Sequence, residues 1–572
     1  MKALALPLMA LCALLPPVSA MAAHPIMLEG YFDDWDDVAP LSLDPEGDAA
    51  AGGIDFLRLS ATNDSFALFL RIEMSQELLH HYDNTMILWI DGDDDATTGL
   101  PVNGIGADLE WRFGSTLGLF HGDAGPDTLL WSRAGILVAP CYAASAIECA
   151  IDRFIMPDGA TRLFVGPSAA FLVQDARPGG DVMPDAEGAR HSFDDSQSLV
   201  PDPILLEREV STDLRIVTYN VLWDNLWHEA PRFRKILGAI EPDVVAFQEI
   251  FSHDAEATAE WMEELFSGTW YAARLGADLV TVSRYPILAT WQPGTAYASA
   301  HLLEIPSRSD SLLLLFNLHL PWGTNDEGRQ HAIDALMGFL RDVMTPGNLP
   351  GIPPGTPVLI TGDTNMLGDP RQLATMHLGD ISDNDTYGPD FSPDWDGSSL
   401  EELISRQPNR RLAFTTYKED SPVAPAHIDR FAYTGSVMEI ANHFILHTPL
   451  LSEELRALYG LSPDDTRLAS DHLPHVADIR RAPPVSAPDA PSRVRLGVFP
   501  NPARTGSRIR VDVPALPCRI ELLDLAGRCV SILSVARGVS RVHVSAPSAP
   551  GMYTLRSRHA STNGTALIVL PD

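Results

Sequence analysis

Residues 358–365 read VLITGDTN, an apolar run followed directly by a carboxylate and an amide. The same order recurs in LRIVTYN at 214–220, VVAFQE at 244–249 and LLLLFNLH at 312–319. Uninterrupted apolar strands are typical of a sheet that is covered on both faces, and ligand sites in such sheets gather at strand ends. We therefore predict an α/β domain whose polar strand ends meet in one cleft.

Two further polar positions continue this pattern. Ile428 leads directly to Asp429, and Asp471-His472 precede the apolar run 473–479. A lone polar residue at a strand end is usually a cap or a turn residue. Because the positions recur in order along 211–482, they favour a shared metal or phosphate site. The candidates are Asn220, Glu249, His319, Asp363, Asn365, Asp429, Asp471 and His472.

The same segments resemble a known family. The blocks IVTYNV, FQEI, SRYPI, NLHLPWG, TGDTNML, HIDRFAY and SDHLPHVADI follow the order of the endonuclease/exonuclease/phosphatase superfamily, and the resemblance spans nearly all of 211–482. It implies a four-layer α/β sandwich, with two packed β-sheets and helices outside, and hydrolysis of phosphate esters. Two blocks depart from the usual family pattern: GDTN stands in place of the commoner GDFN, and HIDRF in place of the commoner IDYIF. Both changes would alter the shape of the phosphate pocket, but neither removes a reacting group.

The resemblance implies how the metal and the water are held. Glu249, Asn220 and Asp471 would bind Mg²⁺ or Mn²⁺, since carboxylate and amide oxygens suit these ions. His472 matches the histidine that activates water. Asp429 matches the carboxylate that fixes its ring and raises its basicity.

The remaining candidates are implied to face the phosphate. His319 would contact the phosphate or assist the leaving group, in place of the tyrosine of apurinic endonucleases. Asp363 and Asn365 would orient the nucleophile and bind a phosphate oxygen. Arg284 of SRYPI is a candidate for substrate binding, although a loop-holding role is slightly favoured. His427 is expected at the surface.

Residues 24–176 have a different pattern, with short alternating strands between Asn-Asp and Gly turns. This pattern is typical of an antiparallel β-sandwich. EGYFDDWDDV at 29–38, ATNDSFALFLRIE and WIDGDDDATTG resemble family-nine carbohydrate-binding modules. The resemblance implies a polysaccharide as a further partner.

Two details of this segment bear on its ligands. Asp91, Asp93 and Asp95 alternate as calcium ligands do. The pattern fits a Ca²⁺ loop and a solvated acidic turn equally well. The three tryptophans that a sugar would stack on are expected instead in the core. They are Trp35, Trp89 and Trp111.

The last segment, 493–572, is a second predicted β-sandwich. PNP at 500–502, DLAGR at 524–528 and GMY at 551–553 resemble the C-terminal sorting domain of the type IX secretion system, which implies that machinery as a partner. A generic immunoglobulin-like accessory domain is the alternative. Polar and proline-rich linkers are predicted at 177–210 and 483–492.

The N-terminus indicates export. Residues 1–20 combine Lys2, an apolar stretch and Val18-Ser19-Ala20, as in a signal peptide, so we expect a secreted or cell-surface protein. Two cysteine pairs remain after cleavage, Cys141 with Cys149 and Cys518 with Cys529. In an exported chain they suggest two short disulfide loops, with unlinked buried thiols as the alternative.

The net charge of −36 argues against tight binding to polyanions, although a metal and local arginines can reverse the field in a cleft. Arg410-Arg411 would contact phosphate or be solvated. An extracellular nuclease is our preferred hypothesis. A sphingomyelinase-like phospholipase or an inositol-phosphate phosphatase follows. A non-catalytic carbohydrate-binding or adhesion protein is the alternative of a different class.

Overall fold

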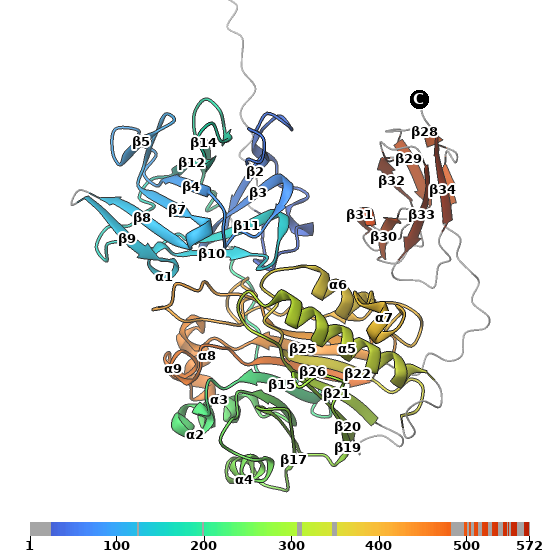
Figure 1. Ribbon diagram of the computed structural model, residues 1–572. Coiled ribbons are helices and arrows are strands. Elements are labelled where there is room, and N and C mark those ends of the chain that lie inside the picture. Colours follow the sequence, from blue (N-terminus) through green and yellow to red (C-terminus); the bar gives the residue numbers. More distant parts are fainter. Residues whose placement is uncertain are drawn as a thin grey trace, which may run out of the picture. The chain divides into compact units, whose positions relative to one another are not determined.

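The computed structural model describes residues 24–122, 125–196, 199–305, 312–345 and 352–481, together with strands between 497 and 570. The chain divides into two compact units, Met1–Ala482 and Pro483–Asp572 (Figure 1). The predicted signal peptide and the linker at 483–492 lie outside the described residues. Within the described part of the chain, no helix has the length and apolar character needed to cross a bilayer.

Two antiparallel sheets share one core in the N-terminal part of the first unit. The first has the order β1-β2-β3-β11-β10, with bounds Pro40–Leu43, Phe56–Asn63, Ala67–Leu78, Ala144–Asp152 and Ile136–Ala139. The second has the order β13-β12-β4-β7-β8-β9, with bounds Val182–Met183, Ser168–Asp175, Met86–Asp91, Leu109–Arg112, Leu117–Gly122 and Gly125–Leu130. Leu70 and Ile72 of the first sheet share a buried cluster with Leu88 and Phe171 of the second. Inward-facing residues of both sheets therefore form this core.

The tryptophans of this part are buried. Trp35, Trp89 and Trp111 are 2%, 8% and 1% exposed, as expected for core residues. The indole Nε1 of Trp35 donates a hydrogen bond of 2.9 Å to Glu148. Glu148 also accepts hydrogen bonds from the backbone N–H groups of Glu29 and Gly30. One buried carboxylate thus anchors the segment at the start of the described chain.

The pKa of Glu148 provides a prediction about stability. Burial raises its pKa from 4.5 to about 8. The folded state therefore binds a proton that the unfolded state has released above pH 4.5. This contribution to stability is fully present below pH 4.5 and is lost as the pH rises through about 8.

We expect the amides of Glu29 and Gly30 to exchange hydrogen faster, relative to their intrinsic rates, as the pH rises from 5 to 8.5. The Glu148→Gln variant removes the titrating group, so its protection at these amides should vary less with pH. Hydrogen exchange with mass spectrometry measures both. Equal pH dependence of protection in the two proteins would contradict this prediction.

The predicted Cys141–Cys149 disulfide is wrong, because both cysteines are free and buried. Cys149 lies on β11, where its side chain joins the core shared by the two sheets. Cys141 faces away from that core, and its Sγ lies 3.5 Å from the backbone oxygen of Met366 and 3.6 Å from that of His427. The two thiols therefore pack in different environments and do not face each other.

Two mixed sheets form the central part of the first unit. One has the order β17-β18-β16-β15-β26-β25, with bounds Tyr271–Leu275, Leu279–Ser283, Val244–Gln248, Leu214–Asn220, His475–Arg481 and Met438–Ile445. The other has the order β19-β20-β21-β22-β24-β23, with bounds Ile287–Trp291, Ala298–Glu304, Leu312–His319, Val358–Asp363, Asp429–Tyr433 and Glu401–Glu402. The pairs β15–β16 and β21–β22 are parallel, which places their carboxyl ends together.

Three hydrophobic clusters define layers in this part. Ile216, Leu315 and Phe431 belong to a cluster between the two sheets. On the outer face of the first sheet, a second cluster includes residues of α3 (Ala230–Ile240) and α4 (Ala255–Leu265). On the outer face of the other, a third includes residues of α5 (Asp326–Met344) and α6 (Arg371–Leu378) (Figure 1). The layers therefore run helix, sheet, sheet, helix.

Helix α5 illustrates how the sequence starts such an element. Asn325 is its N-cap and accepts a hydrogen bond of 3.0 Å from the N–H of Gly328. Asp326 and Glu327 in the first turn complement the positive end of the helix dipole. The shorter helices of the first unit are α1 (Trp131–Ala134), α2 (Asn225–His228), α7 (Asn384–Tyr387), α8 (Glu453–Tyr459) and α9 (Asp465–Ala469).

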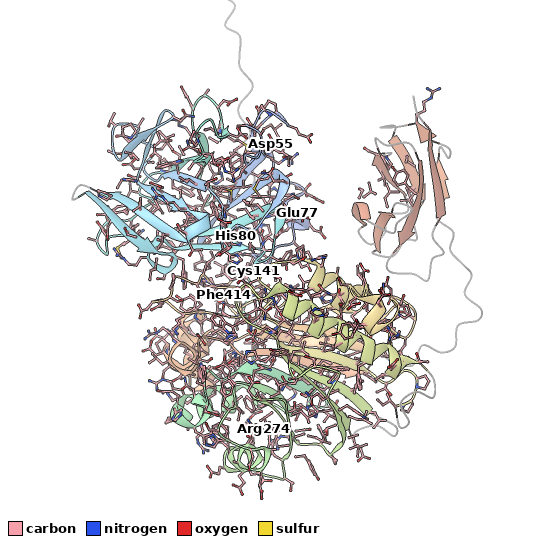
Figure 2. The ribbon with its side chains drawn as sticks, in the orientation of Figure 1. Asp55, Glu77, His80, Cys141, Arg274 and Phe414 are labelled. Atoms are coloured by element: carbon pink, nitrogen blue, oxygen red, sulfur yellow. The ribbon has the colours of Figure 1, made fainter. Side chains whose placement is uncertain are left out.

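The N-terminal sheets and the central part are joined by specific contacts. Leu28 pairs with Leu412 in a parallel bridge. Phe414 and Cys141 line the same small cavity of about 20 Å³ between these parts, and both are labelled in Figure 2. Beside it, Arg430 forms a buried ion pair with Glu402. The two parts thus share buried polar and apolar groups.

The second unit consists of two sheets, described as backbone strands. One has the order β27-β29-β32, with bounds Gly497–Phe499, Arg508–Asp512 and Arg541–Ser545. The other has the order β28-β34-β33-β30-β31, with bounds Ala503–Arg504, Thr565–Leu570, Gly551–Ser557, Cys518–Leu523 and Cys529–Val535. The motifs at 500–502 and 524–528 lie outside the described residues. The register pairs Cys518 with Val535 and Cys529 with Leu523, and both cysteine side chains lie outside the described part.

Candidate active site

Three neighbouring strands bring three candidate residues into one row. The parallel register of β21 and β22 places His319 opposite Asp363. The antiparallel register of β22 and β24 places Asp363 opposite Asp429. Asp363 is 1% exposed and Asp429 is fully buried. The row lies at one end of the sheet, where the apolar strand cores stop.

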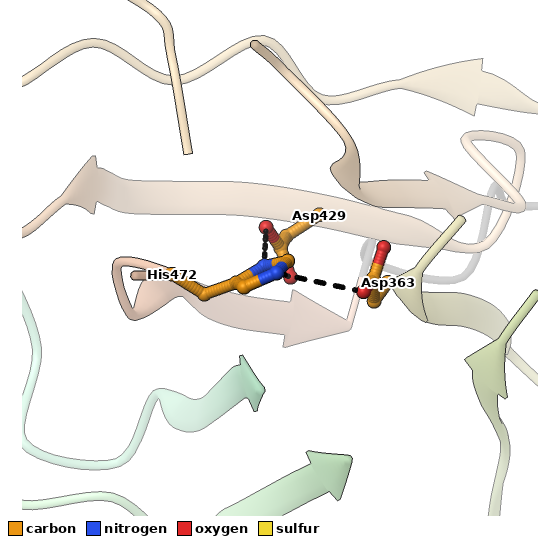
Figure 3. A group of neighbouring side chains, drawn as sticks. All are labelled: Asp363, Asp429 and His472. Atoms are coloured by element: carbon orange, nitrogen blue, oxygen red, sulfur yellow. Dashed lines mark hydrogen bonds and ion pairs between the residues drawn. The ribbon is translucent and has the colours of Figure 1, made fainter. Parts of the chain in front are cut away.

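His472 completes this row from the other sheet's side. It directly precedes the segment leading into β26, and its Nδ1 lies 2.9 Å from Oδ2 of Asp429. Its Nε2 lies 3.6 Å from Oδ2 of Asp363 (Figure 3). Burial opposes protonation of His472, but Asp429, Asp363 and Asp471 outweigh it and raise the pKa to about 10. The ring is thus held in one orientation with Nε2 toward Asp363.

His319 has a matching arrangement with a carboxylate that sequence analysis missed. Its Nδ1 hydrogen-bonds to Asp278, and its Nε2 lies 3.6 Å from Oδ2 of Asp363. Burial opposes protonation, but the hydrogen bond to Asp278 and the charges of Asp363, Asp278 and Glu249 raise the pKa of His319 to about 9. Two His–Asp pairs therefore converge on the same oxygen of Asp363.

Asn220 links this centre to Glu249. Its Nδ2 donates to Oε1 of Glu249 at 2.9 Å and to Oδ2 of Asp363 at 3.1 Å. Its Oδ1 accepts from the N–H of Leu222. Oε2 of Glu249 accepts from the N–H of Trp223 at 2.9 Å. Glu249 itself has a left-handed backbone, with φ of 62°, which is rare for a residue with a side chain and typical of functional sites.

The charge balance of this centre is unusual. Among the described residues, the ion pairs of Asp278, Asp363 and Asp429 are with His319 and His472 alone, and neither Lys nor Arg pairs with Glu249. Burial raises the pKa of the Asp363 carboxyl against the opposing charge of His472. Ligand atoms of Asp363, Asp429 and His472 lie within 4.8 Å of one another. This excess of carboxylate oxygens fits a hard divalent cation such as Mg²⁺ or Mn²⁺.

Two candidate residues lie at the edge of this centre. The Nδ2 of Asn365 donates to the backbone oxygen of Leu320 at 3.0 Å, and its N–H donates to Oδ1 of Asp363. Its contacts therefore hold the loop after β22. Asp471 is paired with Lys418, whose Nζ lies 3.7 Å from Oδ2. Its side chain is 29% exposed, so it influences His472 by charge while facing solvent.

The structure places Arg284 away from the candidate site, which contradicts substrate binding and agrees with the favoured loop-holding role. The predicted substrate contact follows β18 at Ser283, whereas Asp278 precedes the same strand at Leu279, so the strand separates Arg284 from the site. Its guanidinium lies 4.8 Å from the ring centre of Trp270 and donates to the backbone oxygen of Ser267. Arg284 thus holds a loop at the opposite end of the strand.

The positions of three other side chains also differ from our expectations. His427, expected at the surface, is 8% exposed and lines the cavity shared with Cys141. Arg410 stacks on Phe66, with its Cζ 3.6 Å from the ring centre. Arg411 donates to the backbone oxygen of Leu199 and pairs with an aspartate of the N-terminal sheets. The arginine pair is therefore occupied by the contact between the two parts.

The aspartates that lie close together in the N-terminal sheets are not the three that the sequence pattern indicates as calcium ligands. Asp91, Asp93 and Asp108 bring ligand atoms within 4.8 Å of one another. Asp95 instead accepts hydrogen bonds from Thr97. Asp108 comes from the far side of the β5–β6 hairpin (Leu100–Val102 and Ile105–Ala107), so a local spacing pattern could not include it.

Comparison with solved structures finds several that are similar to part of this chain. Three solved structures are similar: humanized TDP2 from D. rerio with 14 mutations, ANGEL2, a 2′,3′-cyclic phosphatase, and an AP endonuclease from Archaeoglobus fulgidus. Their sequence identities are 16%, 15% and 13%, and their TM-scores 0.32, 0.33 and 0.30. They cover 47%, 49% and 46% of this chain, and the matches span 100%, 97% and 98% of theirs.

Sequence comparison gives a narrower result. No curated protein sequence matches the chain. Residues 217–472 match the model of the Endonuclease/Exonuclease/phosphatase family. The match begins within β15, three residues before Asn220, and ends at His472, so it encloses every member of the centre described above. Residues 217–472 of this chain are therefore similar to the endonuclease/exonuclease/phosphatase family, whose members are phosphoesterase hydrolases.

Proposed function

We propose that this protein is a secreted, divalent-metal-dependent phosphodiesterase, with a nucleic acid as its preferred substrate. The observation that carries the proposal is the convergence of two histidines and four carboxylates, with Asp363 at their centre, without a Lys or Arg ion pair among the described residues. The carboxylates are Glu249, Asp278, Asp363 and Asp429. A folded protein tolerates such buried charge when a cation compensates for it.

Glu249 and Asn220 would hold the metal, with Asp363 at its border. When bound, a divalent cation supplies charge neutralisation for the phosphate oxygens and for these carboxylates. In hydrolysis, the oxygen of water bonds to phosphorus and the ester P–O bond breaks. The products are a phosphomonoester and an alcohol.

Two protons must move during this reaction, and the chain has a group placed for each. Asp429 fixes Nδ1 of His472, so Nε2 faces the centre. The surrounding carboxylates favour the protonated ring. A bound cation would offset their charge and allow Nε2 to lose its proton, and Nε2 would then accept the proton of the attacking water. Asp278 fixes Nδ1 of His319 in the same way. Its protonated Nε2 donates to the leaving alkoxide. Oδ2 of Asp363 lies 3.6 Å from the Nε2 atoms of both histidines. Asp363 would therefore position the attacking water and the phosphate between the two rings.

The substrate is tested by comparing phosphoesters side by side. We expect the full chain to hydrolyse bis-p-nitrophenyl phosphate, plasmid DNA and RNA in Mg²⁺ or Mn²⁺, and to stop after EDTA until metal is restored. Release of p-nitrophenolate measures the rate on the synthetic diester, and gel analysis measures the cleavage of DNA and RNA. Sphingomyelin and inositol phosphates are included, and faster turnover of either would replace the nuclease proposal. A protein inactive on all of them would contradict the phosphodiesterase proposal.

A further inference from the structure

Two exposed aromatic rings lie beside the candidate metal ligand Glu249. Trp223 is 68% exposed and Phe251 is 37% exposed. Their ring centres are 4.8 Å apart, and their planes are inclined by 32°. The hydrophobic cluster that contains residues of α3 and α4 has Trp227 on its border but includes neither of these two rings. The described core therefore does not depend on them.

The position of both rings is tied to the site. The backbone N–H of Trp223 donates to Oε2 of Glu249, and Phe251 follows Glu249 by two residues. Asp224 connects the two loops, because its carboxylate accepts from the N–H groups of Phe251 and Ser252. Its own N–H donates to the backbone oxygen of Glu249. The same hydrogen bonds thus orient the metal ligand and the aromatic pair.

The backbone at this point is strained. Leu222, Trp223 and Asp224 have φ values of 49°, 52° and 62°, so three consecutive residues with side chains are left-handed. Each such residue has an energetic cost, and strain of this kind is concentrated at functional sites. Here the strained run turns a large apolar ring toward solvent. Folding alone favours the opposite, which points to a ligand for the ring.

We propose that Trp223 and Phe251 form a platform on which a nucleobase of the substrate stacks beside the scissile phosphate. The inference rests on the proposed phosphodiesterase function and specifies its substrate as nucleic acid with an unpaired base. At a ring-centre distance of 4.8 Å the two rings pack against each other, so Phe251 supports Trp223 and the more exposed indole of Trp223 offers its free face to a planar base. A quaternary ammonium group is instead recognised by rings that enclose it. Bases in a duplex are already stacked, so single-stranded ends or loops bind best.

The test separates binding from hydrolysis. Binding is measured in the full chain carrying His472→Ala, by fluorescence anisotropy of labelled tetrathymidylate and of the same oligomer with abasic sites. We expect the base-bearing oligomer to bind about 10-fold more tightly, the size of one base–aromatic stack. Adding Trp223→Ala should reduce this ratio to about one. The substitution removes the ring but keeps the backbone N–H that holds Glu249.

Two further variants serve as controls for the platform. Trp223→Phe retains a ring and should keep most of the preference for the base-bearing oligomer. Tyr82→Ala removes a ring that is 57% exposed on the N-terminal sheets, and should leave the ratio unchanged. Phe251→Ala should lower the ratio in the same direction as Trp223→Ala.

The outcomes distinguish this proposal from the proposed function. If the wild-type protein hydrolyses the abasic oligomer and the ratio of affinities is one, the platform is wrong and the phosphodiesterase stands. If the ratio is high and depends on Trp223 but nothing is hydrolysed, the platform stands and the enzymatic proposal falls. If Trp223→Ala weakens binding of phosphocholine vesicles and leaves the oligomer ratio high, the rings recognise choline and our inference is overturned.

Discussion

His472→Ala lowers kcat for bis-p-nitrophenyl phosphate by about 10²- to 10⁴-fold, the contribution expected of a positioned general base. The imidazole Nε2 is the group that Asp429 aims at the centre, 3.6 Å from Asp363. Alanine removes the proton acceptor and leaves Asp429 without the partner of its carboxylate. KM should change much less than kcat, because the phosphate contacts remain. Steady-state kinetics in Mg²⁺ measure both constants.

A matched histidine controls for nonspecific effects. His331 lies on α5 with its side chain 52% exposed and its Nε2 3.8 Å from Glu327, so His331→Ala should keep wild-type kcat. Thermal unfolding of both variants checks that each is folded. If folded His472→Ala protein retains more than about a tenth of wild-type kcat, the assignment of His472 as general base is incorrect.

Much of this centre was predictable because strand ends are local features. VLITGDTN and LLLLFNLH each place a polar residue where an apolar run stops, and parallel pairing then aligns Asp363 with His319. Asp278 escaped the same reasoning because it precedes its strand in LGADLV, a position that also suits an ordinary turn residue. Its role depends on β18 running antiparallel to β16, which brings the start of one strand to the end of the other.

The predictions of substrate binding by Arg284 and of exposure for His427 failed, as did those for the Arg410-Arg411 pair, because all depend on contacts that are distant in sequence. Arg284 follows a strand, as Glu249 does, but its strand runs in the opposite direction and ends away from the site. His427 and the Arg410-Arg411 pair are polar and close to loops, which favours exposure in sequence-based reasoning. They are buried or engaged by contacts with the N-terminal sheets, between residues hundreds of positions apart. A single sequence does not specify which surfaces such long-range contacts cover.

Removal of residues 24–199 breaks those contacts, and it is the second change for which we expect a large effect. We expect the shortened chain to unfold at a temperature lower by about 10 °C or more, because several apolar side chains lose their cover and each contributes roughly 1.5–3 kcal/mol. The exposed clusters include Ile428 beside Cys141, and Leu473 and Phe414 beside Leu137. Calorimetry or circular dichroism measures the transition.

The same truncation should lower kcat by roughly 10²-fold in the fraction that remains folded, since small displacements of reacting groups have effects of that size. Ile428 precedes Asp429 and Leu473 follows His472, so both members of the His–Asp pair adjoin the uncovered clusters. The N–H of Ala143 also donates to the backbone oxygen of Gly368, close after Asp363 and Asn365. The N-terminal sheets thus support the loops that carry the centre.

Deletion of 483–572 is the matched control, because these residues form a separate compact unit. That protein should keep the wild-type transition and kcat. A chain without residues 24–199 that matches it in both measurements would show that the N-terminal sheets are an independent module. Loss of both properties in the N-terminal deletion alone would instead make those sheets part of the catalytic structure, with Arg430, Glu402 and Cys141 at the join.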